Sequence, residues 1–130
     1  MRFPSREIVE QIRKKYPAGS RVKLVQMDDP QHPPIGSFGT VLGVDDTGSL
    51  LMSWDAGGGL NVVYGEDIVQ KVAVTTICYG EKTEWTSRRE AGDFFLRAVA
   101  GCDPGSSEFR RYTKIYTEIM TGCSLCTDGE

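Results

Sequence analysis

The chain lacks several features that define common protein classes. Its 130 residues include one histidine, His32, so a catalytic triad or a histidine-based metal site would have to use that residue. No Gly-Lys-Ser or Gly-Lys-Thr follows the glycines of residues 36–48, which excludes a Walker-type phosphate loop. No apolar run approaches the roughly 18 residues of a membrane span, and residues 1–11 hold no apolar core of signal-peptide length. We therefore expect a cytoplasmic protein without a membrane segment.

Cysteine is scarce, and its spacing is incomplete for a metal site. Of the four cysteines, only Cys123 and Cys126 form a C-x-x-C pair. A structural zinc normally takes four ligands, so Cys78 and Cys102 would complete a site only if the fold brought all four together. The pair also follows an expected helix instead of opening one after a strand, unlike a thioredoxin-type motif. We expect reduced thiols, no metal and no cofactor.

The charge is weakly negative in both halves of the chain. The net charge is −3, with 8 basic and 9 acidic residues in 1–71 and 7 basic and 9 acidic residues in 72–130. This balance disfavours attraction of the whole molecule to nucleic acid. Free nucleic acid is expected to bind weakly at most, through a local patch.

Residues 1–71 carry a helix pattern followed by short strands. Ser5 can cap a helix, apolar residues then recur at helical spacing as far as Tyr16, and Pro17 ends the helix. From residue 20 the apolar period becomes two, and turn sequences such as DDTG and AGGG separate five expected strands. Five short strands in about fifty residues predict a small SH3-like β-barrel.

Residues 72–130 predict a different unit, of ββαα type. A hairpin is expected to turn near Gly80, and Ser87 with Glu90 forms a capping box for the first helix. Ser107 can cap the second helix, and residues 123–130 follow as a tail that we expect to fray at its end. The predicted fold class is therefore α+β, with an N-terminal helix and barrel in 1–71 and a ββαα unit in 72–130.

Short motifs of the first half resemble a known family. The landmarks are MDDP at 27–30, GTV at 39–41, VDDTG at 44–48, WDAG at 54–57 and GED at 65–67. Together they are similar to a small SH3-like domain family of unknown function from Gram-positive bacteria, common in their mobile genetic elements. Segments of the second half are similar to uncharacterised proteins of conjugative elements. The resemblance implies a mobile-element accessory protein, an origin shared by antirestriction and anti-CRISPR proteins, and it supplies no catalytic residues.

Two groups of side chains are candidates for binding a partner. Trp54 and Tyr64 either fill the barrel core or form an aromatic binding face of the kind SH3-like barrels use. Basic doublets stand at the expected starts of the two C-terminal helices, where cations are disfavoured by the helix dipole. They are either a solvated helix face or, with a nearby tryptophan, a partner contact. This second group comprises Trp85, Arg88, Arg89, Arg110, Arg111 and Lys114.

These observations predict a non-enzymatic protein that inhibits a host defence system by binding it. The resemblance and the acidic charge together suggest a Cas9-type effector or its guide RNA complex as the leading target, because such effectors expose basic grooves that an acidic protein can occupy. The alternative is a nucleic-acid-binding accessory module of a conjugative element. An enzyme is the least favoured class, since no catalytic constellation can be recognised in the sequence.

Overall fold

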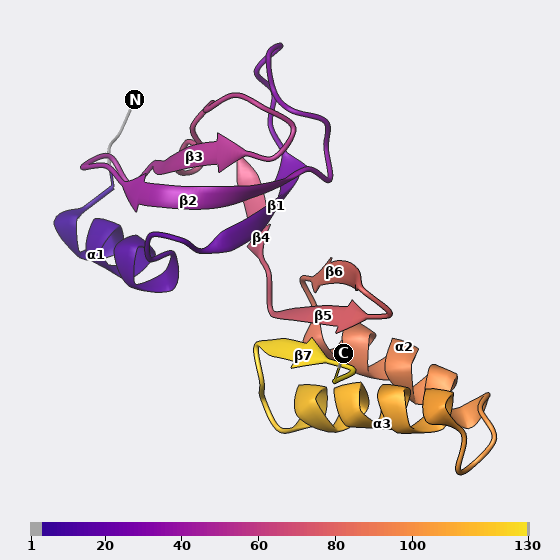
Figure 1. The fold of residues 1–130 in the computed structure, drawn as a ribbon. Coiled ribbons are helices and arrows are strands. Elements are labelled where there is room, and N and C mark those ends of the chain that lie inside the picture. Colours follow the sequence, from indigo (N-terminus) through magenta and orange to yellow (C-terminus); the bar gives the residue numbers. More distant parts are fainter. Residues whose placement is uncertain (1–3, 130) are drawn as a thin grey trace. The chain divides into compact units, whose positions relative to one another are not determined.

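A computed structural model describes residues 4–129, and these adopt an α+β fold, as the sequence predicts (Figure 1). The chain divides into two compact units, Met1–Lys71 and Val72–Glu130, which are called unit 1 and unit 2 below. The division falls where the strand pattern of the first half ends. Within residues 4–129, no helix has the length and apolar character needed to cross a membrane.

Unit 1 begins with the predicted helix, α1 (Arg6–Lys15). The Ser5 side chain accepts a hydrogen bond from the Ile8 backbone N–H at 3.3 Å, which satisfies one of the free amides of the first turn. The helix buries Val9, and Ile12 and Tyr16 pack against the core of the unit. The helix therefore covers part of a sheet.

That sheet has four strands in the order β3-β2-β1-β4, all antiparallel. The strands are β1 (Arg21–Gln26), β2 (Phe38–Val44), β3 (Leu50–Trp54) and β4 (Ile68–Lys71). Alternate residues of the central strands point to one face and form the core. The buried core residues are Val22, Leu24, Met27, Val41, Leu50, Met52, Trp54 and Val62.

The predicted barrel is wrong in one respect, because the sheet does not close. The segment after the AGGG turn, residues 60–65, would supply one of the five expected strands, but it contributes only an isolated bridge between Leu50 and Val62. Side chains occupy several backbone groups that a strand would use for pairing. The Leu60 carbonyl accepts the Trp54 indole N–H at 2.7 Å, and the Val63 N–H donates to the Asp67 carboxylate at 2.8 Å. The sheet therefore stays open between β3 and β4.

Unit 2 contains the predicted hairpin and two helices. These are β5 (Val74–Cys78), β6 (Glu81–Trp85), α2 (Arg88–Ala100) and α3 (Ser107–Met120). Ser87 caps α2 as expected, whereas α3 is capped by Ser106, one residue before the predicted Ser107. The two helices pack on one side of the hairpin around a core of Val74, Ala91, Phe95, Ile115, Ile119 and Cys126.

The C-terminal tail forms a strand that the sequence does not predict. Strand β7 (Leu125–Thr127) lies parallel to β5, giving the sheet order β6-β5-β7. Cys126, at its centre, is fully buried. Glu130, where we expect fraying, lies outside the described residues.

Candidate binding site

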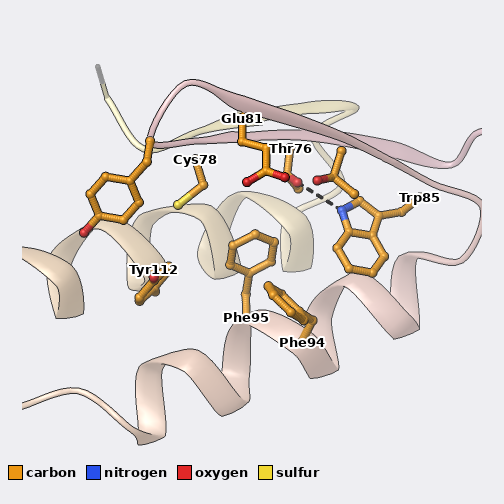
Figure 2. Close-up of a pocket in the computed structure, with 9 residues that line it drawn as sticks. Thr76, Cys78, Glu81, Trp85, Phe94, Phe95 and Tyr112 are labelled. Atoms are coloured by element: carbon orange, nitrogen blue, oxygen red, sulfur yellow. Dashed lines mark hydrogen bonds between the residues drawn. The ribbon is translucent and has the colours of Figure 1, made fainter.

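A pocket of about 320 Å³ opens in unit 2 between the β5–β6 hairpin and helices α2 and α3 (Figure 2). Its walls are Thr76, Cys78, Tyr79, Glu81, Thr83, Trp85, Phe94, Phe95 and Tyr112. Five of these nine side chains are aromatic. The aromatic side chains come from β6, α2, α3 and the turn between the two strands. This volume is at the small end of ligand sites, so the pocket fits one side chain or a small molecule.

Strand alternation explains why the hairpin lines the pocket as it does. In the register of the hairpin, Thr76 pairs with Thr83 and Cys78 pairs with Glu81. Successive residues of a strand point to opposite faces, so residues 76, 78, 81, 83 and 85 share the face that looks toward the helices. The polar side of the pocket is therefore fixed by the hairpin register.

The aromatic side is a connected set of rings. Ring centroids are separated by 5.5 Å for Trp85 and Phe94, 5.1 Å for Phe94 and Phe95, and 6.2 Å for Phe95 and Tyr112. The indole N–H of Trp85 donates to the Thr76 hydroxyl at 3.0 Å. This bond satisfies the one polar group of the indole and leaves its ring free for apolar or cationic contacts.

Tyr79 forms the rim of the pocket in an uncommon conformation. It occupies the hairpin turn with φ of 53°, followed by Gly80 with φ of 77°, the pattern of a two-residue turn that normally uses Asn, Asp or Gly. Its N–H donates to the Asp128 carboxylate at 2.7 Å, and the Arg111 guanidinium lies 4.8 Å from its ring centre. Arg111 also pairs with Asp128 at 3.1 Å. The surrounding contacts thus hold a strained tyrosine where its ring faces outward.

The polar groups of the pocket differ in how they are used. Glu81 projects its carboxylate toward the rings (Figure 2), and within residues 4–129 this carboxylate makes no hydrogen bond or ion pair. Burial, and then the negative charge of Asp128, raises the pKa of the Cys78 thiol. At neutral pH the thiol is therefore protonated and a poor nucleophile.

Three of the predicted basic residues hold the C-terminal segment in place. Arg88 donates to the Ile119 carbonyl at 2.8 Å, to the Cys123 carbonyl at 2.9 Å and to the Ala73 carbonyl at 3.2 Å. Lys114 donates to the Thr127 carbonyl at 2.8 Å, while Arg111 pairs with Asp128 as described above. These bonds give Arg88 and Arg111 a structural role near the starts of α2 and α3 despite the helix dipole, and with Lys114 they connect the helices to strand β7 and the residues beside it.

The other predicted site residues are placed differently. Arg89 and Arg110 are exposed, and neither side chain makes a hydrogen bond or ion pair within the described part of the chain. Trp54 is 4% exposed and belongs to the core of unit 1. Tyr64 is 45% exposed and lines another hollow of about 320 Å³, beside α1 in unit 1. Of the predicted residues, Trp85 lines the aromatic pocket.

Most residues of the pocket are not among the predicted site residues. The apolar spacing of the helix predicts that Phe94 and Phe95 share one buried stripe, but Phe95 is buried while Phe94 is 54% exposed, and Tyr79 is 55% exposed. Adjacent helix residues point about 100° apart, so two neighbouring phenylalanines cannot both face the centre of one core. That spacing is the signal that could have singled out Phe94.

Two of the family landmarks meet at an acidic hollow of unit 1. Segments 27–29 and 66–67 line a space of about 460 Å³. Asp29 accepts the Gln31 N–H at 2.8 Å, and Asp67 accepts the Val63 N–H as noted above, so these carboxylates hold turns. Within residues 4–129, no three His, Cys, Asp or Glu side chains are grouped to hold a metal ion.

Comparison with known proteins matches unit 1. A family model described as a domain of unknown function (DUF4314) matches residues 5–72. No curated protein and no solved structure gives a significant match. The match includes α1 and the four-stranded sheet, whereas the aromatic pocket lies beyond it.

Proposed function

The chain belongs to the family of the domain of unknown function DUF4314, and we propose that it is a non-enzymatic protein that inhibits a host defence system by binding one of its proteins. The binding site is the aromatic pocket of unit 2. The observation that carries the proposal is the pair of half-exposed rings, Tyr79 and Phe94, at the mouth of a pocket that already has a formed volume.

These rings are the kind of anchor that protein interfaces use. Aromatic residues are enriched in the buried centre of interfaces, and a few of them supply most of the binding free energy. The rings are already positioned by neighbouring rings and by the Tyr79 turn. A partner would therefore bind them with a small loss of conformational entropy.

The chemistry of the pocket supports binding over catalysis. The Thr76 hydroxyl accepts the Trp85 N–H, which fixes a ring of the wall. The raised pKa of Cys78 keeps the thiol in its less reactive form. Both potential nucleophiles thus serve to build the wall of the pocket.

The target class is proposed from charge and from the resemblance of residues 22–67 to mobile-element domains. A Cas9-type effector exposes basic grooves for its guide RNA and DNA, and this chain carries a net charge of −3. Electrostatic complementarity of this kind speeds association and helps exclude other partners.

A cleavage assay with purified Cas9-type effectors tests the proposal. Wild-type protein is expected to block DNA cleavage, and Tyr79→Ala/Phe94→Ala is expected to weaken the block about tenfold to a hundredfold. The paired variant Arg89→Ala/Arg110→Ala, which changes exposed residues outside the pocket, is expected to inhibit like wild type.

Two results would count against the proposal. If the wild-type protein inhibits no effector from Gram-positive hosts, the proposal that its target is a Cas9-type effector is wrong. If the double arginine variant loses inhibition and the aromatic variant keeps it, the surface lies at the helix starts. Thermal melts of the same samples separate loss of binding from loss of folding.

A further inference from the structure

We infer that the aromatic pocket of unit 2 takes a lysine side chain of the partner protein, with Glu81 as its counter-ion. This inference rests on the proposed function, since it names the group that the proposed binding site receives. It is carried by the combination of five rings and one carboxylate in the same lining.

The rings provide an environment that favours a cation. The face of an aromatic ring carries a partial negative charge and attracts an ammonium group placed within about 6 Å of its centre. Rings of the pocket come from the hairpin, from α2 and from α3, so they surround the space from several directions (Figure 2). An ammonium group on a long apolar stem suits both the rings and the apolar depth of the pocket.

The carboxylate decides between a cationic and a neutral occupant. The Glu81 carboxylate makes no hydrogen bond or ion pair within residues 4–129, and none of the lining residues is basic. An apolar side chain filling the pocket would remove water from an unpaired carboxylate, which is unfavourable. A cation in the same place would pair with that carboxylate and replace the lost water.

Neighbouring basic residues do not supply this counter-charge. Arg111 lies over the Tyr79 ring and is paired with Asp128. Lys82 pairs with Ile77 in the hairpin register, and strand alternation places it on the face opposite to Glu81. The free carboxylate is therefore left for a group that enters from outside.

The number of acceptors favours lysine over arginine. A guanidinium group has five N–H donors, whereas an ammonium group has three. Besides the Glu81 carboxylate, the side chains of the lining offer only neutral acceptors, the hydroxyl oxygens of its threonines and tyrosines and the Cys78 thiol, and the Thr76 hydroxyl already accepts from Trp85. A buried guanidinium would leave more donors unsatisfied, at a cost in affinity.

The test uses the full chain and small probes whose side chains differ in the charge or the shape of the terminal group. Acetyl-lysine-amide (acetylated at its backbone amine) carries the ammonium group, acetyl-norleucine-amide is its neutral counterpart, and acetyl-arginine-amide carries the guanidinium. The chain has two tryptophans, so its NMR spectrum has two indole N–H signals. The Trp85 signal reports the pocket, and the signal of the buried Trp54 is the internal control.

We expect the lysine probe to shift the Trp85 signal with an affinity about tenfold higher than the norleucine and arginine probes. Glu81→Gln keeps the size of the side chain and should abolish this preference. The matched control is Asp93→Asn, which neutralises an exposed carboxylate of α2 that does not line the pocket. It should keep the tenfold preference.

The outcomes separate this inference from the proposed function. Equal binding of the lysine and norleucine probes, or a lysine preference that survives Glu81→Gln, would overturn the lysine assignment while the pocket remained the binding site. An arginine probe that binds more tightly than lysine would also overturn it. If no probe moves the Trp85 signal, the inference fails, and the cleavage assay with Tyr79→Ala/Phe94→Ala then decides the proposed function independently.

Discussion

The two tryptophans of this chain stand at strand ends in different units and have opposite surroundings. Trp54 ends β3, is 4% exposed and donates its indole N–H to a backbone carbonyl of the loop that covers it. Trp85 ends β6, is partly exposed and donates to a threonine hydroxyl in the wall of a pocket. The comparison shows that covering by a neighbouring segment, and not the strand end itself, separates a tryptophan in the core from one that lines a pocket.

The residue opposite each tryptophan contributes to this difference. Trp54 pairs with Gly39 across the sheet, and an added Cβ at Gly39 would lie 2.6 Å from its ring. The ring therefore packs closely against β2 at a position that has no side chain. Trp85 pairs with Val74. The Val74 side chain belongs to the core of unit 2, and the indole ring of Trp85 packs beside the Phe94 ring.

The largest expected effect is the difference in stability between the alanine variants of the two tryptophans. Trp54→Ala should lower the free energy of unfolding by about 3–5 kcal/mol, as for large core truncations. Trp85→Ala should cost about 1–2 kcal/mol, because part of its surface is already in water. Urea titrations followed by the NMR signals of each unit measure the free energy of unfolding of both variants. Equal losses would contradict the prediction that burial of Trp54 contributes more to stability than burial of Trp85.

The next effect compares two neighbouring arginines. Arg88→Ala removes the donor to three backbone carbonyls around the C-terminal segment and should cost about 1–3 kcal/mol. Arg89→Ala changes an exposed side chain and should stay within about 0.5 kcal/mol of wild type. Thermal melts, together with amide exchange of residues 125–127, provide the measurement. A stable β7 in Arg88→Ala would contradict the role assigned to this residue.

The smallest effect tests the close approach beneath Trp54. Gly39→Ala places a Cβ 2.6 Å from the ring and 3.1 Å from the Ser53 carbonyl, and we expect a net loss of about 1–2 kcal/mol. Gly43→Ala is the control on the same strand, since its nearest neighbour would be 4.0 Å away. It should be neutral or slightly stabilising. Equal effects of the two substitutions in urea denaturation would remove the packing explanation for Gly39.

Local signals in the sequence predicted the elements better than their pairing. Caps at Ser5 and Ser87 and the helical spacing that follows them are short-range, and these helices form where expected. Whether residues 60–65 pair as a strand depends on competition from Trp54 and Asp67 side chains for the same backbone groups. That competition is visible only once the chain is folded, which is why the closed barrel was wrongly predicted.

The pocket is harder to predict from the sequence than the fold. Strand alternation places Glu81 and Trp85 on one face, but the sequence does not show that α2 and α3 leave a space opposite them. The basic residues were predicted as a partner surface because the helix dipole disfavours them. Their hydrogen bonds to residues 119–128 depend on strand β7. This strand is three residues long, too short to show the alternation of apolar and polar residues by which a strand is predicted.

The central claim is that the aromatic pocket is the binding surface. The most direct test measures how tightly two single variants bind the effector that the wild-type protein inhibits in the cleavage assay. Phe94→Ala removes an exposed ring from the pocket of unit 2, and Tyr64→Ala removes a similarly exposed ring from unit 1. Calorimetric titration should show binding weakened about tenfold to a hundredfold by Phe94→Ala and unchanged by Tyr64→Ala. The reverse pattern, with both variants folded, would place the binding surface in unit 1 and contradict the assignment of the aromatic pocket.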